Sequence, residues 1–90
     1  MAIGVFFYPD EMTSTQYNEI LRKLEEAGQA APKGRQHHFA FGDEQSLIVI
    51  DVWESQEDFA DFADALAPVL EEMGIDVEPG MLELHNHIAG

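Results

Sequence analysis

The feature that most constrains the fold is a strand–helix–strand pattern that occurs twice in 90 residues. AIGVFFY at 2–8 is rich in β-branched and aromatic residues and is closed by Pro9 and Asp10, which predicts a strand. SLIVIDVW at 46–53 opens the second half and is the strongest strand prediction in the chain. A helical pattern and a further strand follow each of these segments, so the expected order is β-α-β-β-α-β.

The first helical pattern begins with a capping signature. Thr13 is the expected N-cap, and Gln16 stands at the capping-box position three residues later. Met12 and Tyr17 occupy the two places of a hydrophobic staple. Gly28 is the expected end of this helix.

The second helical pattern begins after Ser55, its expected N-cap. Its apolar stripe has helical spacing and comprises Phe59, Phe62, Ala63, Leu66, Val69, Leu70 and Met73. Pro68 interrupts the stripe. Because proline has no backbone N–H, we expect a kink or an early end there.

The remaining segments complete one sheet. QHHFAF at 36–41 and MLELHNHI at 81–88 are predicted strands, and GDEQS at 42–46 is the hairpin loop before the third strand. No linker or internal duplication divides the chain, so residues 1–90 are expected to form a single domain. The predicted fold is α+β and ferredoxin-like, with a four-stranded antiparallel sheet and two helices on one face.

The charge balance restricts the partners. The chain has 18 Asp and Glu against 4 Lys and Arg, a net charge of −14. All four basic residues lie between 22 and 35. Such a surface repels phosphate backbones and anionic lipids, so neither nucleic acid nor a membrane is an expected partner.

Other sequence features narrow the function further. There is no cysteine, which excludes disulfides and thiolate metal sites. Phosphate-binding glycine loops are missing, so no nucleotide cofactor is expected, and we predict no cofactor of any kind. The segment MAIGVFFYPDEM lacks the basic start of a signal peptide, and a cytoplasmic location is expected.

Strand alternation gives a first assignment of faces. Ile48, Ile50 and Val52 form an all-aliphatic set that is expected to face the helices. The alternate set of the same strand, Leu47, Val49, Asp51 and Trp53, is then expected on the uncovered face. The same logic places Met81, Glu83, His85 and His87 on that face, together with His38. It places His37, Phe39 and Phe41 toward the helices.

These assignments gather a candidate site on the uncovered face. His38, Asp51 and His85 are the expected catalytic centre, because a carboxylate fixes the tautomer of an imidazole and raises its basicity. Ligand contacts are expected from Trp53, Leu47, Val49, Met81 and His87. Two other interpretations of these residues stay open. His38 and Asp51 can be a buried polar pair that fixes strand register, or the histidines and Asp51 can form a metal site. No metal site is assigned.

The chain also resembles a known group. The order of elements, VWES at 52–55 and ALAPVLEEMG at 65–74 resemble the dimeric α/β-barrel proteins of the antibiotic-biosynthesis-monooxygenase-like superfamily. The pattern HHFAF…DVWES…LHN is similar to small members without a known activity. The resemblance implies a homodimer whose two sheets pack into a barrel. It also implies a ligand cavity and such activities as cofactor-independent oxygenation or isomerisation.

One branch of that superfamily does not fit. Its haem-degrading members carry an Asn on the first strand, a Trp and a His on the second helix. Trp53 matches the Trp, but neither of the other two residues has a counterpart, since Asn86 lies in the last strand.

The function predicted is therefore binding of a small apolar or aromatic molecule by a homodimer. Its chemistry would be that of a cofactor-independent monooxygenase or an isomerase that begins with proton abstraction. The alternatives are a non-catalytic structural or interaction dimer without a ligand, and a His/Asp metal-binding protein.

Overall fold

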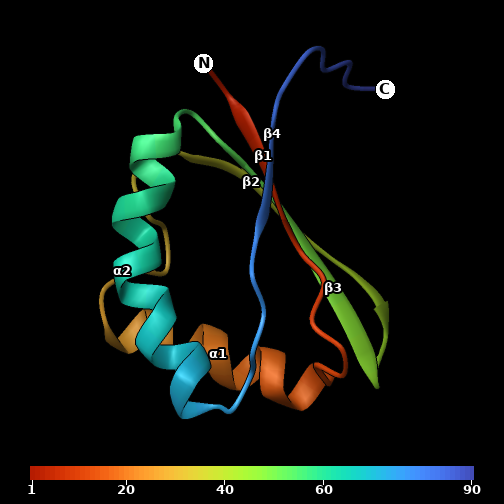
Figure 1. Ribbon diagram of the computed structural model, residues 1–90, viewed down its shortest axis with the longest axis vertical. Coiled ribbons are helices and arrows are strands. Elements are labelled where there is room, and N and C mark those ends of the chain that lie inside the picture. The colour runs from red at the N-terminus through yellow and green to blue at the C-terminus, as the bar shows by residue number, and fades with distance from the viewer.

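The computed structural model describes all of residues 1–90 and confirms the expected order of elements. These are β1 (Ile3–Phe7), α1 (Ser14–Glu26), β2 (Arg35–Asp43), β3 (Ser46–Trp53), α2 (Gln56–Glu72) and β4 (Gly80–Glu83). The strands form one antiparallel sheet in the order β2-β3-β1-β4. Both helices lie on one side of this sheet, and its other side is uncovered (Figure 1). The predicted ferredoxin-like α+β fold is confirmed.

The predicted capping box fixes the start of α1. The Thr13 hydroxyl accepts a hydrogen bond from the Gln16 backbone N–H at 3.2 Å, and the Gln16 side-chain oxygen accepts one from the Thr13 N–H at 2.9 Å. Met12 is buried in the core, and Tyr17 packs against the same core, as the predicted staple requires. Because the cap sets the direction in which the chain enters the helix, it also sets where Tyr17 meets the sheet.

Helix α2 supplies most of the helical contribution to the core. The Ser55 hydroxyl caps it by accepting a hydrogen bond from the Asp58 N–H at 3.1 Å. The helix continues past Pro68 to Glu72, so the early end considered from the sequence does not occur. Its buried residues are Phe59, Phe62, Leu66 and Val69. Neither helix of the chain is long and apolar enough to cross a membrane.

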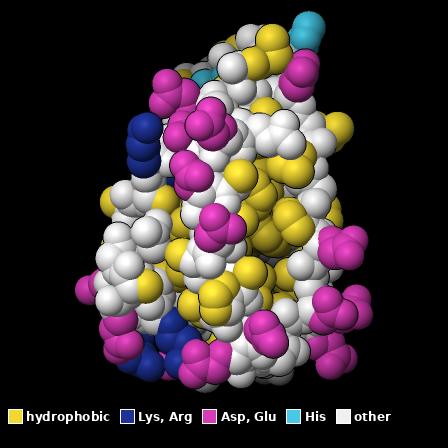
Figure 2. Space-filling model, turned by 60° about the vertical axis from the view of Figure 1, so that its left-hand side comes forward, with side chains coloured by type: hydrophobic (Ala, Val, Ile, Leu, Met, Phe, Trp, Pro, Cys, Tyr) yellow, Lys and Arg dark blue, Asp and Glu magenta, His cyan; other side chains and the backbone are white.

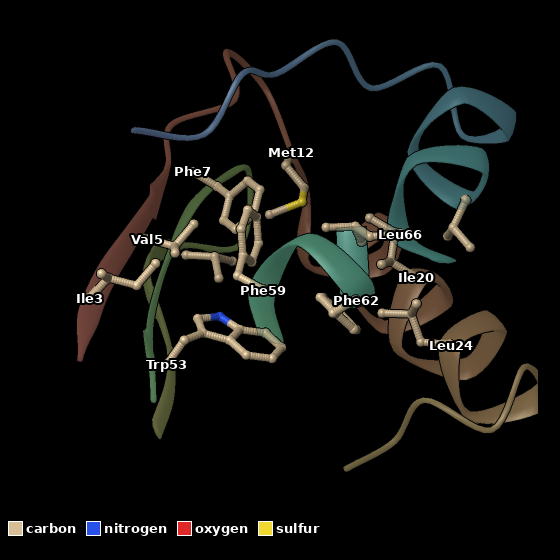
Figure 3. Close-up of a cluster of buried hydrophobic side chains, with 12 residues drawn as sticks. Ile3, Val5, Phe7, Met12, Ile20, Leu24, Trp53, Phe59, Phe62 and Leu66 are labelled. Atoms are coloured by element: carbon tan, nitrogen blue, oxygen red, sulfur yellow. The ribbon is translucent and has the colours of Figure 1, made fainter. Parts of the chain in front are cut away.

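The two faces of β3 are reversed relative to the sequence expectation. Val49, Asp51 and Trp53 are 8%, 2% and 0% exposed, because they point toward the helices. The Trp53 ring lies 5.1 Å from the Phe62 ring and 5.6 Å from the Phe59 ring, between centroids, within the core drawn in Figure 3. The aliphatic set expected in the core, Ile48, Ile50 and Val52, lines the uncovered face instead.

The expectation for β2 is wrong in the same way. His38 stands opposite Asp51 in the sheet and shares its face, so it points toward the helices. Phe39 and Phe41 point to the uncovered side, where they are 45% and 50% exposed. His37 stands opposite Val52 on that same side.

Strand β4 is shorter than predicted. It ends at Glu83, so His85 and His87 lie in a tail for which strand alternation does not apply. Met81 stands opposite Val5, whose side chain is buried under the helices, and therefore belongs to the helix side rather than the uncovered side. Leu82, which is 67% exposed, takes the uncovered side.

Candidate functional site

Three polar side chains from three elements form a continuous hydrogen-bonded chain beneath the helices. Asp51 on β3 lies 2.5 Å from His38 on β2, between the carboxylate Oδ1 and the imidazole Nδ1. The other ring nitrogen, Nε2, lies 2.6 Å from the hydroxyl of Tyr17 on α1. The Tyr17 and His38 rings are nearly parallel, with 5.9 Å between centroids. The series Asp51–His38–Tyr17 is called the relay below.

The order of donors in the relay follows from the chemistry of its ends. A carboxylate accepts hydrogen bonds only, so the His38 Nδ1–H donates to Asp51. In a neutral imidazole Nε2 is then an acceptor, and it accepts the Tyr17 O–H. The second oxygen of Asp51 accepts a hydrogen bond from the Trp53 indole N–H at 3.4 Å, which completes the environment of the one buried charged side chain.

The environment favours the neutral form of Tyr17. Burial raises the pKa of its hydroxyl above the ordinary value of 10.0, and the negative charge of Asp51 raises the pKa further. The positive charge of Arg35 opposes both effects and lowers that pKa. Tyr17 therefore holds its proton at neutral pH and can release it only as another group accepts it.

The relay borders an apolar cavity between the sheet and the helices. The cavity measures about 60 Å³. Tyr17, His38, Asp51 and Arg35 provide its polar wall. The other lining residues are predominantly hydrophobic and come from β1, β3, both helices and the connection to β4: Phe7, Pro9, Met12, Ile20, Leu21, Leu24, Val49, Phe62, Leu66, Leu70, Ile75 and Val77. Seen from the side of α2, acidic side chains surround a hollow of hydrophobic ones (Figure 2).

A β-bulge brings Arg35 to this wall. Residues three apart on a regular strand point to opposite faces, which would separate Arg35 from His38. The register between β2 and β3 shifts between Arg35 and His37, so Gln36 is an extra residue. Arg35 consequently stands opposite Trp53, and His38 stands opposite Asp51, both on the helix side.

The structure unites two of the three residues expected to be catalytic. His38 and Asp51 are in contact, as expected, although on the covered side of the sheet. His85 lies exposed in the tail after β4 and takes no part in the cavity wall or the relay. His87 is also outside the cavity, and its ring lies 5.5 Å from that of His37, between centroids.

The residues expected to contact a ligand are divided. Val49 lines the cavity. Trp53 is a fully buried core residue that touches the site through its hydrogen bond to Asp51, and Leu47 packs against the core. Met81 is 43% exposed and lies outside the cavity wall.

Tyr17 and Arg35 are the functional candidates that the sequence did not reveal. Tyr17 has the spacing of a packing residue on an amphipathic helix, and nothing local marks its contact with a histidine 21 positions away. The place of Arg35 depends on the bulge, which leaves no clear signature in RQHHFAF. No three His, Asp or Glu side chains come together in a geometry that could hold a metal ion.

Compared by sequence, the chain matches no protein-family model and no curated protein. Solved structures do match its fold. SnoaB, a cofactor-independent oxygenase from Streptomyces nogalater, superposes with a TM-score of 0.64 at 14% identity, over 99% of this chain and 96% of SnoaB. Rv0793 from Mycobacterium tuberculosis gives a TM-score of 0.66 at 13% identity, over 99% of this chain and 100% of Rv0793.

A protein from Chloroflexus aurantiacus J-10-fl, proposed to be an antibiotic biosynthesis monooxygenase, superposes with a TM-score of 0.66 at 12% identity. The match covers 99% of this chain and 98% of that protein. The matches are end to end, so the likeness extends over the whole chain. The chain has the fold of the antibiotic-biosynthesis-monooxygenase-like proteins, as its sequence resemblance implied.

Proposed function

We propose that the chain binds a small, largely apolar or aromatic molecule in the cavity and removes a proton from one of its carbon atoms. The relay supports this proposal most directly. Its outer member, Tyr17, lines the apolar cavity, and a proton can pass from the Tyr17 hydroxyl to His38. The activity would be that of a cofactor-independent monooxygenase or an isomerase. The fold shared with SnoaB agrees with the first of these.

In the proposed reaction the Tyr17 oxygen takes a proton from the substrate as its own proton passes to His38 Nε2. The imidazolium that results is stabilised by the Asp51 carboxylate 2.5 Å from Nδ1. The base in contact with the substrate is thus Tyr17, since both nitrogens of His38 are already hydrogen-bonded. His38 accepts the proton and Asp51 positions His38.

The carbanion can react in two ways. Return of the proton to a different carbon gives an isomer. Alternatively, O₂ oxidises the carbanion: an activated CH₂ becomes C=O, one oxygen atom enters the product and the other leaves as water. The four electrons lost by the carbon are those gained by O₂, so no further reductant is needed.

We also propose that residues 1–90 act as one domain in a homodimer formed through the uncovered sheet face. That face is mainly apolar: its large side chains are Phe6, Phe39, Phe41, Ile48, Ile50, Val52 and Leu82, together with one polar ring, His37. Apart from Asp43 at the hairpin tip it carries no carboxylate, although the chain has 18 acidic residues. A second copy suits it best, because two such faces can exclude water without bringing negative charges together.

One observation favours a non-catalytic dimer as the second candidate. The cavity of about 60 Å³ is much smaller than ligand pockets of roughly 300–1,000 Å³. Binding therefore requires either a small ligand or movement of the wall, in which Ile75 and Val77 belong to an irregular connection. In the non-catalytic alternative the relay only joins α1 to the sheet.

Exchange of a substrate proton distinguishes these functions. Small carbon acids such as 2-indanone would be incubated with the protein in D₂O, with exchange at the CH₂ followed by NMR and O₂ uptake by an electrode. Loss of the Tyr17 hydroxyl in Tyr17→Phe should slow the catalysed exchange by about 100-fold or more. Asp61→Asn on the exposed side of α2 is the control. Exchange no faster than in buffer would favour the non-catalytic dimer. Catalysed exchange that is equally fast in the Tyr17 variant would overturn the role of Tyr17 as the base.

A further inference from the structure

One basic side chain in this acid-rich protein has no carboxylate partner. Arg22 pairs with Glu19 and Glu26, and the two lysines pair with carboxylates at 2.9 and 4.0 Å. Arg35 has no carboxylate within 4.0 Å of its guanidinium. With 18 acidic residues against 4 basic ones, an unpaired arginine is unexpected unless its position prevents pairing.

The hydrogen bonds of Arg35 are also largely unused. Its Nη2 donates to the carbonyl oxygen of Ala30 at 3.1 Å. A guanidinium has five N–H donors, so most of them are available to another acceptor. Its central carbon lies 6.0 Å from the centroid of the Phe62 ring, and this cation–π contact holds the charged group at the cavity.

A β-bulge in β2 places Arg35 at the cavity wall. Without the bulge, Gln36 would be paired in a regular strand, and Arg35, three residues from His38, would point to the uncovered face. Bulges of this kind redirect a side chain and occur often beside functional sites. The positive charge is also close enough to the relay to lower the pKa of Tyr17.

We propose that Arg35 is an anion-binding residue and that the ligand of the cavity is a small apolar molecule bearing a carboxylate. This inference rests on the proposed binding function and adds the chemical class of the ligand. A guanidinium binds a carboxylate through two parallel N–H···O hydrogen bonds. The apolar body of the ligand would fill the hydrophobic part of the cavity, with its reactive carbon toward Tyr17.

The overall negative charge of the protein makes a preference for an anionic ligand a specific test of Arg35. At −14 the protein repels anions, and Asp51 adds a negative charge in the cavity wall. Any preference for an anionic ligand over its neutral analogue must therefore come from a local positive group. Arg35 is the only lysine or arginine in that wall.

Benzoate and benzamide are suitable probes because they have nearly the same shape and differ in charge. Binding would be followed by the fluorescence of Trp53, the only tryptophan, which packs on the cavity residue Phe62. Backbone NMR shifts of Tyr17, Arg35 and His38 would place the probe. We expect benzoate to bind about tenfold or more tightly than benzamide, and Arg35→Gln to abolish that preference. Arg22→Gln removes the same charge from the exposed face of α1 and should preserve it.

The outcomes separate this inference from the proposed function. Equal binding of both probes in the cavity, unchanged by Arg35→Gln, would overturn the role of Arg35 and leave the binding function standing. No shift of the cavity signals with either probe at millimolar concentration would overturn both. The comparison of the two probes in the unmodified protein decides the matter even if the Arg35 variant is unstable.

Discussion

Tyr17 is the residue whose titration connects the relay to stability. In the folded protein its pKa lies above 10.0, chiefly because it is buried and next because of Asp51. The folded state thus holds this proton more tightly than the unfolded chain. The resulting stability is complete below pH 10 and is lost as the pH rises through the folded pKa.

Tyr17→Phe should remove that dependence while keeping the ring. Above pH 10, the free energy of unfolding should fall more steeply with pH in the unmodified protein than in this variant, as measured by urea unfolding. Tyr8→Phe is the matched control, because Tyr8 is 59% exposed and should leave the profile unchanged. Parallel profiles for all three proteins would mean that Tyr17 ionises freely in the folded state.

Helix α1 is the element whose start most directly affects the site. Thr13→Ala removes the side-chain acceptor of the capping box and should lower the free energy of unfolding by about 1 kcal/mol. Thr15→Ala, exposed in the first turn of the same helix, should have a much smaller effect. Thermal or urea unfolding measures both. Equal losses from the two substitutions would show that the cap contributes little.

Elements were predictable from this sequence, whereas their faces were not. The caps at Thr13 and Ser55 and the span of β3 follow from local patterns, and the structure has all three. The faces of β3 were reversed because both of its sides are apolar. An acidic residue suggested exposure, yet Asp51 is buried with hydrogen bonds to His38 and Trp53, contacts that local sequence does not reveal.

The candidate site was likewise predictable only in part. The contact between His38 and Asp51 was predictable, because adjacent hairpin strands set these residues opposite each other. The contribution of Tyr17 depends on how α1 packs over the sheet, and that of Arg35 on a bulge. Both are tertiary features. The expectation for His85 failed because β4 ends two residues before it.

For the whole molecule, the apolar uncovered face predicts self-association. The chain of 10.1 kDa should sediment at twice its mass, and Phe39→Asp should reduce it to a monomer. The substitution should preserve the helical circular dichroism, because Phe39 is 45% exposed in the single chain. Asn18→Asp adds the same charge on the exposed side of α1 and should leave the dimer intact. A monomeric unmodified protein would contradict the proposed interface.

The net charge of −14 predicts a strong response to salt. Repulsion among the carboxylates opposes the compact state, and it is largely screened in about 1 M NaCl, where the Debye length is about 3 Å. The midpoint of thermal unfolding should therefore rise with NaCl concentration. A midpoint that stays constant or falls would show that local ion pairs, such as those of Arg22, outweigh the general repulsion.

The bulge at Gln36 gives β2 one residue more than its ladder with β3 requires. Exchanging Gln36 for another exposed polar residue leaves the side-chain alternation of the strand as it is. Deleting it leaves Arg35 two residues from His38, the spacing at which a regular strand sets both side chains on one face, so Arg35 would still point toward the cavity. In the evolution of such a chain, loss of this one residue would keep Arg35 and His38 on one face and would remove only the local bend and added twist of the bulge.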